Sequence, residues 1–373
     1  MNHPPAIEIE TLQSNQRPKD NSHPRVALMI LNFNGLRWLK VCLPSVVKST
    51  YPRLALLVID NGSTDGSIEF VRANYPSVSI IRFEENLGFA EAYNRAIGRI
   101  KAKYVLLLNN DTEVLDREWI DIMVGRAEKD RAMACVGCKL VSMQDHQKLD
   151  SLGGVGIRYW RGFRDIGKNE SDNRQYDAPP VVPFSACAAA VLIRRSAFVE
   201  VGGFDSKLFT YFEDVDLSWR LRLLGYKIMC ELSVRVAHHL SGTSGIGKNG
   251  LSRFVAHKNV MRIIIKNTGS SIGWALRNYL LFATIETMVS CVRIAPRKAA
   301  AAVRGILWNV LNFRDTYGSR LLIQRTRRTS EAEILASMYP KLPIDRSLIR
   351  AMPLPQRLFN NLFERLNGPC KNT

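Results

Sequence analysis

The stretch VALMILNFNG, residues 26–35, followed by LALLVIDNGSTDGS, residues 54–67, decides the fold class of this chain. Each stretch begins with an apolar run as long as a buried strand and ends in the small and polar residues typical of a turn. Residues 36–48, between the two runs, have the apolar spacing of an amphipathic helix. A buried strand, a helix and a second buried strand in this order predict a parallel α/β unit.

The same alternation continues outward from this unit. Apolar runs predict further strands at 79–83, 104–108, 136–140, 188–193 and 234–237, and helices are predicted over 67–75, 89–100, 196–202 and 214–224. No Pro/Gly-rich linker divides these segments, so we expect one α/β domain over residues 25–265, with a mostly parallel mixed sheet flanked by helices. Residues 1–24 are rich in Pro, Asn and charge and lack the apolar core of a secretory signal. They predict a disordered tail on a cytoplasmic protein.

Composition limits the possible partners. The 373 residues are 46% hydrophobic and 23% charged, which excludes a mainly disordered chain. The net charge of +18 favours an acidic partner such as a nucleic acid, an anionic membrane surface or a phosphorylated small molecule. The seven cysteines are odd in number and scattered, which indicates a reducing compartment without a disulfide framework.

The C-terminal region, residues 266–373, is expected to be a helical extension. Residues 255–373 contain 19 Lys and Arg against 6 Asp and Glu, a net charge of +13. The apolar segment 272–292 is interrupted by Arg277 and Glu286, and a charge such as Arg costs about 2.5 to 3.5 kcal/mol at the centre of a bilayer. We therefore expect this region to lie on an anionic membrane surface, at the inner face of the plasma membrane, and not to span it. The alternative is a set of solvated helices that pack on the domain.

Polar residues follow several of the predicted strands at the point where each strand ends. In an open α/β sheet, ligands bind beyond the carboxyl ends of the strands, which makes Asp60 and Asp111 candidate ligand-binding residues. Turn chemistry would also explain Asp60, and a helix cap would explain Asp111. Neither a G-x-G-x-x-G fingerprint nor a Walker A loop is present.

Two later clusters add groups that could perform acid–base or metal chemistry. Glu213, Asp214 and Asp216 lie at the start of a predicted helix, and the adjacent like charges could raise one pKa into the range of a general base. His238 and His239 follow a predicted strand, where two adjacent imidazoles favour a ligand role over a core role.

Six motifs taken together resemble the family 2 glycosyltransferases of the GT-A fold, and most of all the rhamnosyltransferase-like enzymes of bacterial polysaccharide biosynthesis. They lie within residues 25–265, in the order typical of that family: LNFNG (31–35), VIDNGSTDGS (58–67), ENLGFAEAYNRAI (85–97), LLLNNDTEV (106–114), LIRRSAFVEVGGFDSKLFTYFEDVDLSWRL (192–221) and HHLSGTS (238–244). The resemblance implies a Rossmann-like GT-A domain and inverting transfer of a sugar from a nucleotide diphosphate to a polyprenyl-diphosphate-linked saccharide acceptor. Rhamnose from dTDP-rhamnose is the first expectation for the sugar, and galactose, galactofuranose, mannose and N-acetylhexosamines remain alternatives.

The resemblance also implies roles for single residues. Phe33 would pack on the pyrimidine ring, Asp60 would accept a hydrogen bond from the base N3–H, and Asp111 would bind Mg²⁺ or Mn²⁺ as the second acid of a D-x-D element. His239, which fits the pattern H-x-x-G-x-S, would be a further metal ligand. Asp214 would be the general base, oriented by its neighbours Glu213 and Asp216. The remaining residues expected at the nucleotide-sugar site are Asn34, Asn86, Gly88, Asn94, Asn109 and Asn110.

One departure from the family pattern keeps other functions open. Asn109 occupies the first acid position of D-x-D, and an amide is a weaker ligand for a hard cation than a carboxylate. A catalytically inactive, membrane-surface binding relative is therefore an alternative. A sugar nucleotidyltransferase is less consistent with the sequence, because residues 31–38 lack a Gly-rich, triphosphate-gripping loop. Nucleic-acid binding is not expected, because the basic segments lack interleaved stacking aromatics.

Overall fold

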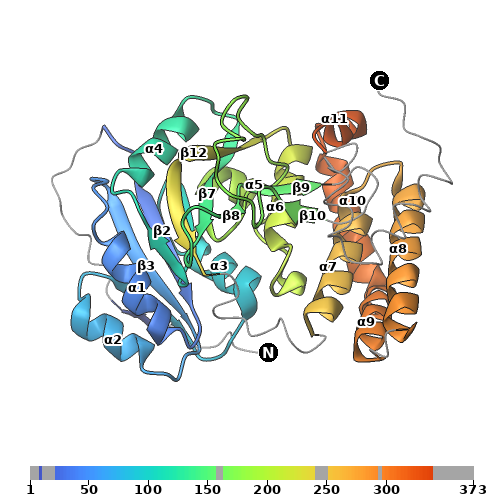
Figure 1. Cartoon of the computed structure of the whole chain (residues 1–373), viewed down its shortest axis with the longest axis horizontal. Coiled ribbons are helices and arrows are strands. Elements are labelled where there is room, and N and C mark those ends of the chain that lie inside the picture. The colour runs from blue at the N-terminus through green and yellow to red at the C-terminus, as the bar shows by residue number, and fades with distance from the viewer. Residues whose placement is uncertain (1–7, 11–21, 157–162, 240–250, 293–295, 339–373) are drawn as a thin grey trace. The chain divides into compact units, whose positions relative to one another are not determined.

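Four parallel strands carry the α/β pattern that the sequence predicts. In the computed structural model (Figure 1), β2 (Val26–Asn32), β3 (Leu54–Asn61), β4 (Ser79–Phe83) and β5 (Tyr104–Asn109) lie side by side in the order β4-β3-β2-β5. The chain moves outward from β2 to β4 and then returns to the other side of β2. In such sheets ligands bind where the strand order reverses, which is here beyond the carboxyl ends of β2 and β5.

The structure describes residues 8–10, 22–156, 163–239, 251–292 and 296–338. Contacts within the chain divide it into two units, one of residues 1–155 and 165–245 and the other of residues 156–164 and 246–373. The expected domain boundary after residue 265 is wrong, because it falls inside helix α7 (Leu251–Asn267). This helix packs along α8, α9 and α10 of the second unit, whose ranges are given below.

Further strands extend the sheet of the first unit beyond β5. β11 (Ala190–Arg194) lies antiparallel between β5 and β7 (Met133–Ser142), β12 (Lys227–His238) is parallel to β7, and β6 (Thr112–Val114) is antiparallel to β12. β8 (Leu149–Ser151) pairs with β7, and β9 (Gly154–Gly156) pairs with β10 (Phe163–Asp165). The sheet is thus mixed around a parallel centre, as the sequence predicts.

The N-terminal segment differs from the expected disordered tail at one point. β1 (Glu8–Glu10) pairs antiparallel with β4, whose outer edge offers unpaired backbone groups to a further strand. The other residues of the predicted tail, apart from 22–24, lie outside the described residues.

Helices cover both faces of the sheet. Alternate residues of β2 point to opposite sides, so Val26, Leu28 and Ile30 belong to one apolar core and Ala27 and Met29 to the other. The first core is covered by α1 (Leu36–Val46), α2 (Ser67–Asn74) and α4 (Trp119–Glu128). The second is covered by α3 (Gly88–Gly98), α5 (Arg195–Glu200) and α6 (Glu213–Leu223).

Beyond residue 246, the described part of the second unit consists of helices and the short links between them. They are α7, α8 (Ile272–Val292), α9 (Pro296–Leu311), α10 (Phe313–Thr326) and α11 (Glu331–Ala336). Among the residues that the structure describes, none of the helices combines the length and the apolar character needed to cross a bilayer. Glu286 of α8 is buried and pairs with His257 of α7 at 3.0 Å and with Arg253. Glu286, the acidic residue that interrupts the apolar segment, therefore forms ion pairs within the helical unit.

Candidate functional site

A buried asparagine joins the loops that follow β2, β3 and β5. The Asn32 amide donates to the hydroxyls of Ser63 and Ser67 at 3.1 and 3.0 Å, and its carbonyl oxygen accepts from Asn110 at 2.8 Å. A Cβ at Gly35 would lie 2.0 Å from the Asn110 amide, so only glycine leaves room for this contact. Asn110 is therefore fixed to the end of β2.

Asn34, which is expected to contact the ligand, also forms hydrogen bonds within the protein. It is exposed and has a φ of 48°, a conformation that Asn tolerates better than most residues. Its carbonyl oxygen accepts from the Thr64 backbone at 2.8 Å, and its own N–H donates to Ser63 at 3.0 Å. Phe33, one position earlier, is partly exposed at the same strand end.

Asp60 ends β3 as a fully buried carboxylate. One oxygen accepts from the Ser63 backbone at 3.2 Å, while Oδ2 accepts no hydrogen bond from the described residues and lies 3.5 Å from Nε of Arg82. Burial raises the pKa of Asp60 above its ordinary value, against the opposing effects of Ser63 and Arg82. A carboxylate oxygen without a hydrogen bond, such as Oδ2 of Asp60, can accept one from an N–H group of a ligand.

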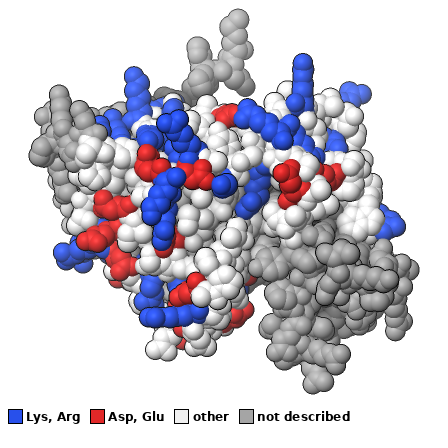
Figure 2. Space-filling model, turned by 90° about the horizontal axis from the view of Figure 1, so that it is seen from above, with Lys and Arg blue, Asp and Glu red and all other residues white. Residues whose placement is uncertain are grey.

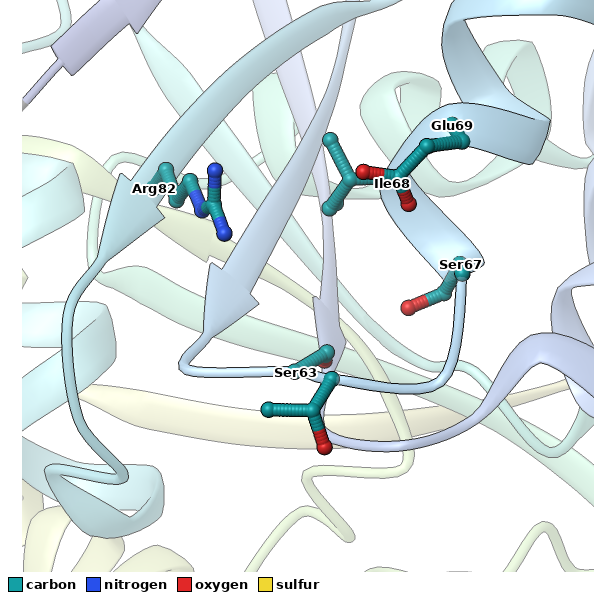
Figure 3. A pocket seen from close by; sticks show the side chains of 7 residues that line it. Ser63, Ser67, Ile68, Glu69 and Arg82 are labelled. Carbon is teal, nitrogen blue, oxygen red and sulfur yellow. The ribbon is translucent and has the colours of Figure 1, made fainter.

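A pocket of about 350 Å³ adjoins Asp60. Figure 3 shows Arg82 on β4 facing the start of α2 across the end of β3, with Ser63 on the loop between them. The lining residues are mainly polar: Ser63, Thr64, Gly66, Ser67, Ile68, Glu69 and Arg82. Arg82 is not evident as a site residue from the sequence, because a charged residue in a short apolar strand is most simply explained as solvent-exposed.

Asn86 and Gly88 shape the loop before α3. The Asn86 carbonyl oxygen accepts from Asn61 and from the Gly88 backbone, each at 2.9 Å. Gly88 has a φ of 78°, and a Cβ there would lie 2.4 Å from the Phe209 ring. The Phe209 carbonyl accepts from the Phe89 backbone at 2.7 Å. Gly88 thus permits the close approach of the segment that leads to α6.

Both polar groups of the Asn94 side chain form hydrogen bonds with the backbone. Its carbonyl oxygen accepts from Phe204 N–H at 2.8 Å and its amide donates to the Phe204 carbonyl at 2.9 Å. These bonds tie α3 to the segment before the short helix η1 (Ser206–Leu208). The structure thus gives Asn94 a role in holding this loop, and its expected place in the wall of the nucleotide-sugar site stays a prediction.

Asp111 follows β5 and lies beside both histidines. Antiparallel pairing of β6 with β12 places Thr112 opposite His238, so that Asp111 Oδ1 lies 3.5 Å from His238 Nε2. The His239 N–H donates to the Asp111 carbonyl at 2.9 Å. Asp111 is buried, whereas Asn109, the last residue of β5, is partly exposed.

The two histidines have different surroundings. The His239 ring packs against Trp38 with ring centroids 4.2 Å apart, and its buried Nδ1 has no hydrogen-bond partner within the part of the chain that the structure describes. His238 contacts Asp150 Oδ2 through Nδ1 at 2.7 Å. Burial lowers the pKa of His238, but the bonds to Asp111 and Asp150 outweigh this effect and raise it to about 9.

These residues fit a divalent cation only together with ligands from a substrate. Among the described residues, no group of three or more His, Cys, Asp or Glu side chains could hold a metal ion. Asp111 and one imidazole supply two donors, so a bound diphosphate would have to supply others. The partnerless His239 Nδ1 and the short separation of Asp111 from His238 are both consistent with such a pair.

The three acidic residues at the start of α6 differ in their burial and in their hydrogen-bond partners. Asp216 is fully buried and bonds Arg220 at 2.8 Å, which places it in an internal ion pair of α6. Glu213 is buried with Oε2 lacking a hydrogen-bond partner, and burial together with Asp214 raises its pKa well above the ordinary range. Asp214 is partly exposed. Burial and the charge of Asp165 raise the pKa of Asp214 to about 6, although the Ala188 N–H opposes this shift.

A short path of hydrogen bonds connects Asp214 to the end of β5. Asp214 Oδ2 accepts from the Ala188 N–H at 3.1 Å, and the next carbonyl, that of Ala189, accepts from the Asn109 N–H at 2.9 Å. Asp214 is therefore linked through the Ala188–Ala189 backbone to Asn109, the last residue of β5 and two positions before Asp111.

Backbone strain marks the segment before α6. Phe209, Tyr211 and Phe212 have φ values of 65°, 65° and 67°, each a left-handed conformation that costs about 1 to 3 kcal/mol for such residues. Strain of this kind persists where the surroundings impose it and is concentrated at functional sites. Sequence patterns carry no sign of it, because aromatic residues do not predict positive φ.

Comparison with known proteins agrees with this geometry. Residues 28–201 match the family model described as glycosyl transferase family 2. An O-antigen biosynthesis protein RfbC of Myxococcus xanthus is 25% identical over 59% of this chain and 18% of its own length. An N-acetylglucosaminyl-diphospho-decaprenol L-rhamnosyltransferase of Mycobacterium tuberculosis is 26% identical over 70% of this chain and 92% of its own length.

Two solved structures have the same fold. GalNAc-T7 with UDP, GalNAc and Mn²⁺ has a TM-score of 0.56 at 16% identity, covering 81% of this chain and 60% of its own. A mannosyltransferase of Pyrobaculum calidifontis with GDP-Man and Mn²⁺ has a TM-score of 0.50 at 15% identity, covering 93% of this chain and 87% of its own. The chain has the GT-A fold, and its residues 28–201 form a family 2 glycosyltransferase domain, with rhamnosyltransferases among its relatives.

Proposed function

We propose that this glycosyltransferase transfers a sugar, with inversion, from a nucleotide diphosphate donor to a polyprenyl-diphosphate-linked saccharide. The observation that carries the proposal is the position of Asp214. Its carboxylate has a raised pKa and is partly exposed, and the backbone that it bonds also bonds Asn109, the last residue of β5 and two positions before Asp111. A base and a diphosphate-binding acid at one strand end are what a single displacement requires.

The donor base would bind at the end of β3. The unpartnered Oδ2 of Asp60 suits the N3–H of a pyrimidine, and Phe33 offers a partly exposed ring at the next strand end. Both uracil and thymine carry this N–H. The rhamnosyltransferase relative favours a rhamnosyl donor, so dTDP-rhamnose is the first substrate to test.

Asp111 and an imidazole would hold Mg²⁺ or Mn²⁺ together with the donor diphosphate. Such a cation neutralises the charge that develops on the leaving diphosphate. Asn109, in place of an acid, leaves Asp111 as the carboxylate of this pair. The residue expected as its histidine partner from the motif is His239.

Asp214 would accept the proton of the acceptor hydroxyl while that oxygen attacks the anomeric carbon. The bond from this carbon to the diphosphate breaks as the new bond forms, so the configuration inverts and no covalent intermediate is required. A carboxyl group with a pKa near 6 is ionised at neutral pH and is still a stronger base than an ordinary aspartate. Glu213 lies beside it, and burial together with the charge of Asp214 raises the pKa of Glu213.

The acceptor would be reached at the inner face of the plasma membrane. The name of the mycobacterial relative includes a diphospho-decaprenol acceptor, and such a lipid stays in the bilayer. The face in Figure 2 shows Lys and Arg side chains interspersed with Asp and Glu, with no single basic patch. We therefore assign membrane contact to exposed apolar and basic residues of α9 and α10, and not to the overall charge.

Release of the nucleotide diphosphate tests the proposal. Purified protein is mixed with UDP- and dTDP-sugars, Mn²⁺ or Mg²⁺, and a polyprenyl-diphosphate-linked saccharide. We expect acceptor-dependent release of one nucleotide diphosphate and a product of inverted anomeric configuration. Binding of nucleotide diphosphates without any release across this panel would favour the inactive, membrane-binding alternative.

A further inference from the structure

Asp150 is a buried carboxylate that the reaction described above does not use. It lies on β8 and is 3% exposed, and its two oxygens have separate partners. Oδ2 lies 2.7 Å from His238 Nδ1, and Oδ1 pairs with Lys168. An ionised carboxylate only accepts hydrogen bonds, so the proton between these groups belongs to Nδ1 of His238.

This bond determines what the other side of the His238 ring offers. With Nδ1 protonated and held by Asp150, the proton that a cation would displace is the one on Nε2, and this atom lies 3.5 Å from Asp111 Oδ1. Two donors that share a small divalent cation at about 2.1 Å lie about 3 to 3.5 Å apart. A carboxylate behind a metal-binding histidine is the common arrangement that fixes its tautomer and raises its basicity.

We infer that Asp150 is a positioning residue, and that it selects His238, in place of His239, as the imidazole partner of Asp111 at the cation. The inference rests on the proposed function and deepens it. It differs from the motif-based expectation, in which His239 fits H-x-x-G-x-S. The ring of His239 packs on Trp38, and its link to Asp111 is a backbone hydrogen bond.

The opposing interpretation is that His238 only bridges two buried carboxylates. Both interpretations predict lower stability when Asp150 is changed, so stability cannot separate them. They differ in the affinity for Mn²⁺ and in the nitrogen atoms that surround the bound ion.

The test measures Mn²⁺ binding to the full chain in the presence of dTDP. Free Mn²⁺ is followed by its EPR signal, and imidazole ligation by the ¹⁴N modulation of the bound ion. We expect Asp150→Asn to bind Mn²⁺ about 10 to 100-fold more weakly than the wild type. Asp165→Asn is the matched control, because it removes a charge close to the same site without touching the His238 bond.

Histidine variants complete the test. His238→Gln should lose the ¹⁴N modulation, whereas His239→Gln should keep it. The reverse pattern, or equal Mn²⁺ affinity of Asp150→Asn and the wild type, would overturn the assignment of Asp150 and His238. A wild-type chain that binds no Mn²⁺ with dTDP would instead contradict the proposed function itself.

Discussion

At the scale of single residues, Asp214, the proposed general base, lies in an environment that disfavours its charged form. Burial and Asp165 favour its protonated form, so folding is opposed by its charge once the pH exceeds the ordinary pKa of an aspartate. Groups placed for catalysis often reduce stability in this way. Replacing the carboxylate by its amide separates the two effects.

We predict that Asp214→Asn lowers turnover about 10² to 10⁴-fold, the range typical of a general base, and leaves nucleotide diphosphate binding near the wild-type level. The amide oxygen can still accept from the Ala188 N–H. The thermal midpoint at pH 7.5 should equal or exceed that of the wild type, and the difference should shrink below pH 4. Nucleotide release and calorimetry measure both, and near-normal turnover would remove Asp214 from the mechanism.

The pH dependence of turnover follows from the same shift. The carboxylate is the active form of a base, so the rate should rise with pH and level off above about 6. In Asp165→Asn the rising limb should move to lower pH, since the charge of Asp165 raises the pKa of Asp214. If the rising limb keeps its position in Asp165→Asn, a group other than Asp214 controls the pH dependence.

A residue of this site can be predicted from the sequence when its own strand or helix determines its position. It cannot be predicted when contacts with distant parts of the chain determine it. Asp60, Asp111 and Asp214 directly follow strands or begin a helix, so their positions are visible in the order of the chain. Asn32 and Asp150 were not predicted, because the contacts of each come from loops or strands distant in sequence.

At the scale of elements, α3 is tied to the segment before η1 by the side chain of Asn94. Two hydrogen bonds to Phe204 replace backbone pairing between these elements. We predict that Asn94→Ala lowers the free energy of unfolding by about 1 to 3 kcal/mol, because it leaves backbone groups of Phe204 unsatisfied.

Asn74→Ala is the control for this variant. Asn74 is exposed at the end of α2, where its amide bonds only the carbonyl one turn earlier, so its loss should stay within about 0.5 kcal/mol. Urea unfolding of the intact chain measures both variants. Equal losses would mean that the Asn94 bonds add nothing to stability.

Elements with continuous apolar runs were the ones that the sequence predicted well. The strand expected at 79–83 has those bounds in β4, and β2, β3 and β5 extend one or two residues beyond their predictions. Only residues 234–237 of β12 were predicted. A register shift between Glu231 and Arg235 interrupts the alternation of buried and exposed side chains along this strand. α4 was not predicted as a helix, although it buries Trp119, Ile120 and Met123.

At the scale of the whole molecule, the division of the chain could not be read from composition. α7 carries Lys258, Arg262 and Lys266, which indicate a solvated helix, yet all three are buried. Arg262 pairs with Asp315 of α10 at 2.8 Å, and Lys258 lies over the Trp308 ring of α9. A truncation after Asn267 would remove Asp315 and Trp308, which contact Arg262 and Lys258, so it cannot test membrane binding cleanly.

Exposed residues of α9 and α10 offer a cleaner test. Apolar side chains recur at helical spacing on each helix, at Val303, Leu307, Val310 and Leu311 and at Phe313, Tyr317 and Leu321. Residues 296–328 contain 8 Lys and Arg and 1 Asp. An amphipathic surface of this composition binds anionic bilayers through apolar insertion and about 1 kcal/mol per basic residue.

We predict that Leu307→Glu combined with Phe313→Glu reduces sedimentation with vesicles of phosphatidylcholine and phosphatidylglycerol at least tenfold. Val199→Glu is the control, since Val199 is 56% exposed on α5 of the other unit and should not matter. Wild-type binding should weaken with added salt and on pure phosphatidylcholine, because part of the attraction is electrostatic. Binding that survives the double substitution would place the lipid contact elsewhere in the chain, and equal loss in the Val199 variant would show a general effect of added negative charge.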